Sequence, residues 1–152
     1  MTITDGQRAT ESQQPDSETA FWLAFSRVPY IGPARIERLL QAFGSLSCAW
    51  SVPQEELRVA LEPRSLSELL AARSRIDPAG ELEGLVRKGI SVVHPGHPTY
   101  PRLLAEISGR PSILYVRGEL APADDVSVAI VGTRRATPYG RQATERIAAE
   151  LA

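Results

Sequence analysis

The chain has 152 residues, of which 43% are apolar and 23% charged, the ordinary composition of a globular protein with one domain or two small ones. No apolar run approaches the roughly 20 residues of a membrane span, and a net charge of −1 argues against a uniformly basic nucleic-acid binder. Cys48 is the only cysteine, which excludes a disulfide framework and a cysteine-based zinc site within one chain.

Residues 1–17 are predicted to be a disordered leader, because they are polar and their charges are mostly acidic. They lack the apolar core of a secretory signal. With a single cysteine and no such signal, we expect a cytoplasmic protein.

Five segments with helical periodicity predict a compact helical domain over residues 18–89. These segments are SETAFWLAFSRV, PARIERLLQAFG, SVPQEELRVAL, SLSELLAARSRI and DPAGELEGLVRKG. In the second, Pro33 near the start and Gly44 at the end are the expected punctuation of a helix. In the fourth, Ser65 and Glu68 have the spacing of a capping box.

The pattern changes at residue 90, where short β-branched or aromatic runs bounded by proline and glycine predict strands. The predicted order is strand ISVVH, a short helix at 101–106, strand SILYVRG, strand VSVAIVG at 126–132 and a final helix TPYGRQATERIAAELA. Strand, tight turn and helix open a parallel α/β fold. The apolar face of the final helix is left without a covering strand, so we expect the chain to be the front part of a longer protein.

The turn between the last strand and the last helix is predicted to hold an anion. The Gly132 backbone allows close approach of a phosphate, and the free amides of a helix start carry partial positive charge. Thr137 can cap that helix, with a proline at its first position. Arg134 and Arg135 add guanidinium groups at the sheet edge where α/β folds bind ligands. The alternative is that both arginines are simply solvated loop residues.

The residues after Gly132 do not follow the dinucleotide pattern G-x-G-x-x-G, so a nucleotide or nucleic-acid phosphate is favoured over a nicotinamide cofactor. VAIVGTRRATPYGRQATERIAAELA resembles the first strand and helix of the Rossmann-like domain of the DNA-processing protein A (DprA/Smf) family, which shows Gly-Ser-Arg followed by Thr-Pro-Tyr-Gly. YPRLLAEISGRPSILYVRGEL resembles the segment that precedes it in that family. VPYIGPARIERLLQAFGS resembles its SAM-like (helix-hairpin-helix-like) amino-terminal region.

The resemblance implies an α/β chain with a SAM-like domain at 18–89 and the start of a truncated Rossmann-like domain at 90–152. It implies a protein of competence and natural transformation that binds single-stranded DNA and loads the RecA recombinase, with no catalysis, cofactor or metal. It also implies a homodimer formed through a region beyond residue 152. The family's DNA-binding positions correspond to Gly132, Thr133 and Arg134, with threonine in place of serine. Three nearby residues are included in the predicted site: Arg135, Tyr139 and Gly140.

Two other functions remain open at this point. A nucleotide-binding enzyme of the nucleoside-monophosphate phosphoribohydrolase type resembles the same Gly-Thr-Arg turn and would use it for a nucleotide phosphate. A helical module that docks a partner protein is the third hypothesis. The extra helical domain favours the DNA-binding interpretation.

The segment VPYIGPARIERLL also resembles a helix-hairpin-helix turn, which binds DNA phosphate through backbone amides. Tyr30 stands where that motif has a glycine, so a structural helix junction is favoured over DNA contact. Arg35 and Arg38 would be the nearest basic groups.

Two histidines and two tryptophans are further candidates for ligand binding. His94 and His97 have an H-x-x-H spacing, but the prolines around them exclude a regular helix and favour turn residues over metal ligands. Trp22 and Trp50 could stack on bases. Trp22 lies in a thick apolar run, so a core position is favoured.

Overall fold

The structure is a computed structural model that describes residues 17–120 and 127–151, and it divides into two compact units, one ending at Leu120 and the other beginning at Ala121. Almost all of the predicted leader therefore lies outside the described residues. Described helices and strands show a helix-rich α/β chain, as predicted at that level. None of the described helices combines the length and the apolar character needed to cross a membrane. The predicted domain division at residues 17 and 89 stays a prediction.

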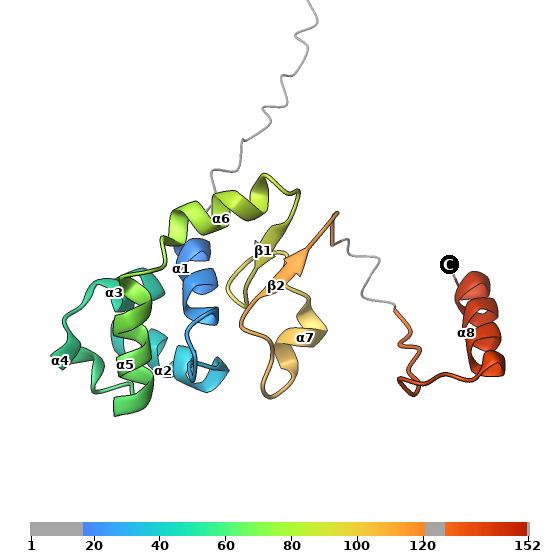
Figure 1. Ribbon diagram of the computed structural model, residues 1–152, viewed down its shortest axis with the longest axis horizontal. Coiled ribbons are helices and arrows are strands. Elements are labelled where there is room, and N and C mark those ends of the chain that lie inside the picture. The colour runs from blue at the N-terminus through green and yellow to red at the C-terminus, as the bar shows by residue number, and fades with distance from the viewer. Residues whose placement is uncertain (1–16, 121–126, 152) are drawn as a thin grey trace, which may run out of the picture. The chain divides into compact units, whose positions relative to one another are not determined.

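The first unit consists of short helices followed by a small sheet (Figure 1). Its elements in chain order are α1 (Ser17–Ser26), α2 (Pro33–Phe43), α3 (Leu46–Ser51), α4 (Gln54–Leu57), α5 (Pro63–Arg73), α6 (Pro78–Val86), β1 (Ser91–Val93), α7 (Arg102–Glu106) and β2 (Leu114–Val116).

The ends of α2 form as the sequence predicts. Pro33 occupies the first turn, where no amide hydrogen is needed. Gly44 has a φ of 79°, in the left-handed region that favours glycine, and its amide donates to the Leu40 carbonyl at 2.8 Å. The glycine therefore ends the helix while satisfying one of its last carbonyls.

The predicted capping box at Ser65 is wrong. Helix α5 begins two residues earlier at Pro63, and Glu62 is its N-cap. Ser65 therefore lies inside the first turn, where its hydroxyl donates to the Glu62 carbonyl at 3.0 Å. The proline at the first helical position sets the start of α5 in place of the serine motif.

Helix α3 was not predicted, and its start is satisfied both by a local residue and by one far away in the sequence. The Ser45 hydroxyl caps it locally, accepting from the Cys48 amide at 3.1 Å. The Glu18 carboxylate of α1 accepts from the amides of Leu46 at 2.6 Å and Ser47 at 3.2 Å. This contact joins α1 to α3, and a carboxylate at a helix start is favoured by the helix dipole.

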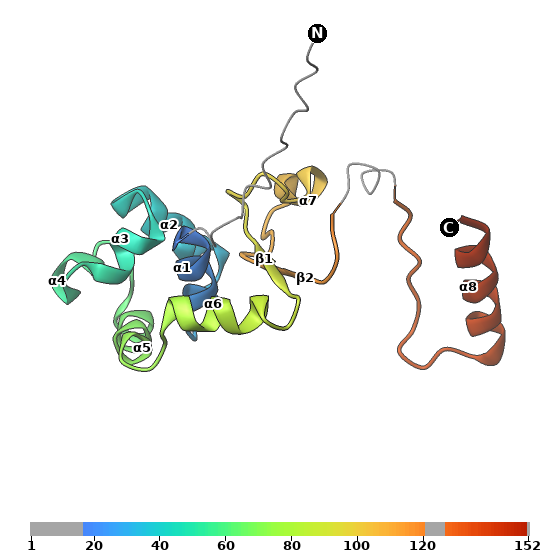
Figure 2. The same cartoon turned by 90° about the horizontal axis from the view of Figure 1, so that it is seen from above.

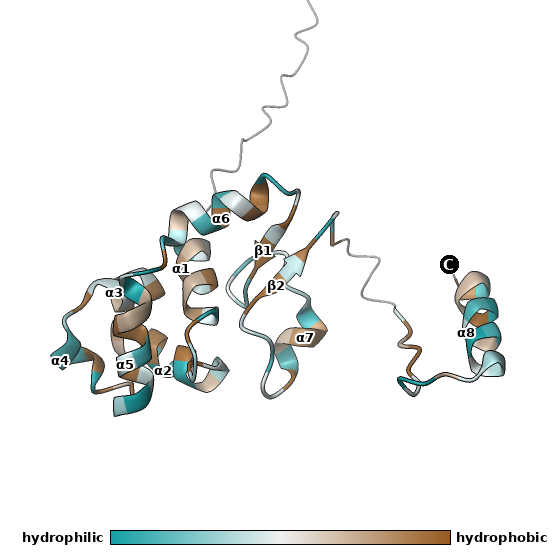
Figure 3. Cartoon of the chain, viewed as in Figure 1, coloured by the Kyte–Doolittle hydropathy of each residue, from teal (hydrophilic) through white to brown (hydrophobic). Residues whose placement is uncertain are grey.

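The core of the first unit forms around α1, which contacts both α3 and α6 (Figure 2). Trp22 is 7% exposed, which confirms its predicted core position, and Phe25 is completely buried. Trp50 packs edge-on against Phe25, with ring centroids 5.3 Å apart. Figure 3 shows apolar residues along most of α1, as expected for a helix buried on several sides.

Strands β1 and β2 pair antiparallel, with Val92 opposite Tyr115. Burial alternates along β2, and Val92 packs with Leu23 of α1 and Leu82 of α6. The sheet therefore packs against helices α1 and α6 of the first unit. Both strands and α7 were predicted at these positions.

The second unit contains α8 (Pro138–Leu151), the predicted final helix. The strand predicted at 126–132 is not observed over its described residues 127–132, which have no regular secondary structure. A strand needs a neighbour to bond its amides and carbonyls, and none pairs with this segment in the described part of the chain. Its apolar side chains are exposed, Val131 by 90%.

Candidate functional site

The start of α8 is built by a local cap. The Thr137 hydroxyl accepts from the Gly140 amide at 3.1 Å, and the Arg141 amide donates to the Thr137 carbonyl at 3.0 Å. Pro138 is the first helical residue. These contacts confirm that Thr137 caps the helix. The first turn contains no acidic residue, so nothing in it opposes the partial positive charge of the helix start.

The turn before α8 carries the predicted site residues on an exposed segment. Gly132, Thr133, Arg134 and Arg135 are all exposed. The Thr133 hydroxyl donates to the Arg135 carbonyl at 3.1 Å, which folds the turn on itself. A side-chain carbon added to Gly132 would meet nothing within 4 Å, so the protein itself leaves space at this glycine for a ligand.

The last two predicted site residues belong to the first turn of α8. Tyr139 is 80% exposed, and Gly140 is half-buried. All six predicted residues are thus brought together by sequence adjacency in one turn and helix start. Whether they bind DNA stays a prediction.

The side chains of Arg134 and Arg135 have no acidic partner within ion-pair distance among the residues that the structure describes. Arg146, further along α8, differs, because its Nε lies 2.9 Å from Glu150 Oε1. An unpaired guanidinium beside a capped helix start can bind an anion through two parallel hydrogen bonds and through helix amides.

The predicted hairpin site has different electrostatics. Arg35 Nε lies 2.7 Å from Glu62 Oε2, and Arg38 Nη2 lies 2.9 Å from Glu62 Oε1. Hydrogen bonds from Arg35 and then Arg38 lower the pKa of Glu62 from 4.5 to about 2. Both arginines are therefore used to join α2 to the start of α5, as in the favoured structural interpretation of this junction.

Tyr30 occupies a strained position in the same junction. Its φ is 63°, which L-residues with large side chains rarely adopt. Arg64 lies over the Tyr30 ring, 3.9 Å from its centroid, and donates a hydrogen bond to the phenol oxygen. This contact holds the residue that replaces the glycine of the motif.

His94 and His97 order the turn that follows β1. His94 is 5% exposed and stacks on Trp22 with ring centroids 4.8 Å apart. Its Nδ1 accepts from the Gly96 amide at 3.2 Å, and His97 Nδ1 accepts from the Thr99 amide at the same distance. Within the described residues, no three histidine, cysteine or acidic side chains gather as a metal site would require.

Sequence reasoning missed a cleft of about 550 Å³ in the first unit, lined by residues of α1, α2 and the loop between α7 and β2. Glu37, Gln41 and Arg110 supply its main polar groups. The spacing of Glu37 and Gln41 places them on one face of α2, but nothing local in the sequence indicates that a loop 70 residues later faces them.

The described helices and strands define a helix-rich α/β protein. Comparisons with known proteins show which family this chain is similar to. The family model of DNA recombination-mediator protein A matches residues 91–152. Protein Smf of Synechocystis is 34% identical over 90% of this chain and 36% of its own length. The putative DNA processing protein DprA of Mycobacterium tuberculosis is 30% identical over 90% of this chain and 38% of its own length. No solved structure matches.

These matches confirm the resemblance to the DNA-processing protein A (DprA/Smf) family that was inferred from the sequence. The chain spans little more than a third of the length of these curated relatives.

Proposed function

We propose that the chain binds single-stranded DNA as a non-catalytic mediator of DNA recombination and natural transformation. The names of its relatives, DNA recombination-mediator protein A, Smf and DprA, support a role in DNA processing. One structural observation supports the proposed DNA-binding site. Arg134 is exposed and has no acidic partner among the described residues, and it stands directly before a helix start capped by Thr137.

In this proposal the phosphate oxygens of the strand lie against the turn at Gly132, Thr133 and Arg134. The Arg134 guanidinium binds one phosphate with two hydrogen bonds, and the open backbone at Gly132 lets that phosphate approach. Arg135, Tyr139 and Gly140 flank it. Contacts of this kind position the strand without reading its sequence.

The same proposal gives residues 127–151 a place in a larger fold. The apolar segment 127–132 and α8 are proposed as the first strand and helix of a Rossmann-like domain, and residues 18–89 as a SAM-like domain. Ile147 and Leu151 of α8 are 46% and 60% exposed, an apolar face that such a sheet would cover. The proposed partners are the RecA recombinase and a second copy of the chain. The proposed location is the cytoplasm.

Binding of an oligo-dT strand to the 152-residue chain tests this function, measured by fluorescence anisotropy over a range of salt concentrations. Affinity is expected to fall as salt rises, with a log–log slope near −0.7 for each phosphate neutralised. Arg134→Ala should weaken binding about tenfold or more, because it removes a charge-assisted contact.

Arg146→Ala is the matched control. It removes the same charge from the same unit, but from an arginine of α8 that is already paired with Glu150, and should change affinity far less. Equal effects of the two variants would contradict the site. Oligo-dT binding that is absent or indifferent to salt would contradict the function, and release of free base from a nucleoside monophosphate would favour the phosphoribohydrolase alternative.

A further inference from the structure

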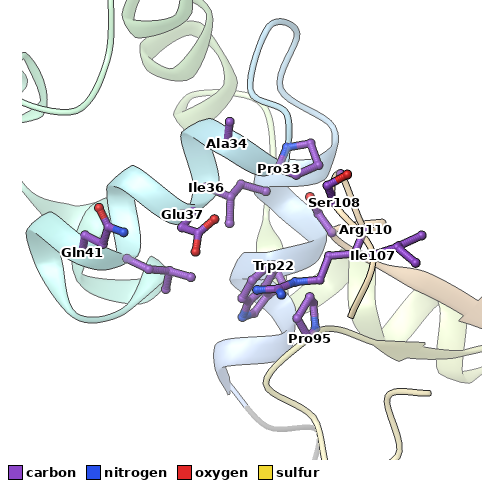
Figure 4. A pocket seen from close by; sticks show the side chains of 13 residues that line it. Trp22, Pro33, Ala34, Ile36, Glu37, Gln41, Pro95, Ile107, Ser108 and Arg110 are labelled. Carbon is purple, nitrogen blue, oxygen red and sulfur yellow. The ribbon is translucent and has the colours of Figure 1, made fainter. Parts of the chain in front are cut away.

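The cleft in the first unit has the size and the mixed chemistry of a ligand site. Its volume of about 550 Å³ falls within the usual range for small-molecule sites, about 300–1,000 Å³. Ile36 of α2 and Trp22 of α1 provide apolar lining (Figure 4). Leu40 of α2 lines the same cleft. The Trp22 ring stacks on the His94 ring, a contact that helps to hold it in place.

The loop wall of the cleft is also held in place. Arg110 Nη1 donates to the Ala105 carbonyl at 3.0 Å. Tyr100, which is 8% exposed, donates from its hydroxyl to the Pro111 carbonyl at 2.9 Å. Because these bonds order the loop before any ligand arrives, binding need not supply the free energy of ordering it.

Two unlike charges line this cleft without neutralising each other. Glu37 is exposed on α2, and Arg110 is half-buried on the loop opposite. Figure 4 shows the Glu37 carboxylate on the side of α2 that faces Trp22 and Arg110. No ion pair involves either residue within the described ranges, and Arg110 uses only Nη1 in its hydrogen bond there. The cleft therefore offers free acceptors on one wall and free donors on the other.

We propose that this cleft binds the base of an unstacked guanine nucleotide. The inference rests on the proposed function, because single-stranded DNA is the source of the base. Guanine presents two neighbouring donors, N1–H and N2–H₂, on one edge and two neighbouring acceptors, O6 and N7, on another. The Glu37 carboxylate matches the donor edge, and the Arg110 guanidinium matches the acceptor edge.

The other DNA bases fit this charge pattern less well. Thymine, cytosine and adenine each carry a single donor group that a carboxylate can bind, so none gives Glu37 a pair of hydrogen bonds. Reading a splayed base by its polar edges while its flat faces lie on apolar side chains is the usual mode for single strands. Gln41, one turn along α2, adds a neutral donor and acceptor beside Glu37.

Guanosine, which has no phosphate, tests the cleft separately from the turn before α8. In a nitrogen–proton NMR titration of the 152-residue chain, the indole signal of Trp22 should shift with guanosine. The signal of Trp50 should not, since that ring packs against Phe21 and Phe25 and does not line the cleft. Glu37→Gln should weaken guanosine binding about tenfold, because a pair of charge-assisted hydrogen bonds is lost.

Glu55→Gln is the matched control, since it removes one exposed carboxylate of α4 and should leave guanosine binding unchanged. Adenosine or cytidine binding as tightly as guanosine overturns the proposal. So does a Trp22 signal that no nucleoside moves, the result expected of a cleft that accepts only a protein segment. Loss of oligo-dT binding with guanosine binding intact would overturn the proposed function alone. The reverse would overturn this inference alone.

Discussion

Three arginines of the first unit are used differently from Arg134 and Arg135 of the second unit. In the first unit, Arg35 and Arg38 are paired with Glu62, and Arg73 is bound to backbone carbonyls. In the second, Arg134 and Arg135 are exposed and have no acidic partner in the described part of the chain. The comparison teaches that arginine content indicates a phosphate site only where the protein does not already use the guanidinium for its own structure.

The largest expected effect is on the free energy of unfolding, and it distinguishes a buried residue of the first unit from an exposed residue of the second. Phe25→Ala should lower the free energy of unfolding by about 3–5 kcal/mol, because it removes a completely buried ring and leaves a cavity. Tyr139→Ala removes an aromatic ring that is 80% exposed and should stay within about 0.5 kcal/mol of the parent chain. Urea unfolding followed by far-ultraviolet circular dichroism, which reports the helices of both units, measures both. Similar losses for the two variants would mean that Tyr139 is covered in solution.

A smaller effect is expected at an arginine that holds the structure. Arg73 of α5 donates to the Ala49 carbonyl at 2.7 Å and to the Val52 carbonyl at 2.8 Å, at the end of α3. Burial lowers the pKa of its guanidinium, and the two carbonyls accept hydrogen bonds from its Nη atoms. Arg73→Ala should cost about 2 kcal/mol of unfolding free energy, since both carbonyls lose a charged donor.

Arg58→Ala is the control for Arg73, since it removes an exposed arginine and should change stability by less than about 0.5 kcal/mol. Equal losses at positions 58 and 73 would show that net charge, and not the two carbonyl contacts, determines the effect.

Local signals in the sequence were enough for most helices. Pro33 and Gly44 set the limits of α2 through backbone geometry that each residue carries with it. The short strands and α7 were also predicted at their observed positions. Helix α3 was missed, and only part of its start is local: Ser45 caps it, but Glu18 becomes a second cap only after α1 has packed beside it.

The candidate site divides in the same way. The cap at Thr137 could be predicted, since threonine followed by proline acts within four residues. The pairing of Arg35 with Glu62 could not, because 27 residues separate the two. The cleft beside Trp22 depends on the loop at Arg110 in the same manner. At these sites, the contacts that the sequence did not reveal are tertiary.

The smallest expected effect tests the arginine pairing directly. In the folded chain the pKa of Glu62 is about 2, against 4.5 ordinarily, so its ionised form stabilises the fold above pH 4.5. That contribution should be lost as the pH falls from about 4.5 toward 2. Glu62→Gln should remove this part of the pH dependence. Because the pair is exposed, 1 M NaCl should remove most of the effect as well.

Urea unfolding at a series of pH values, together with an NMR titration of the Glu62 carboxyl carbon, measures the change. Arg35→Gln provides the complementary variant, since the Arg35 hydrogen bond is the largest cause of the shift, and it should raise the pKa of Glu62. A Glu62 pKa that is the same with and without Arg35 would leave that guanidinium free for a ligand. The contrast between the two units would then fail, and the hairpin of α2 would become a second phosphate site.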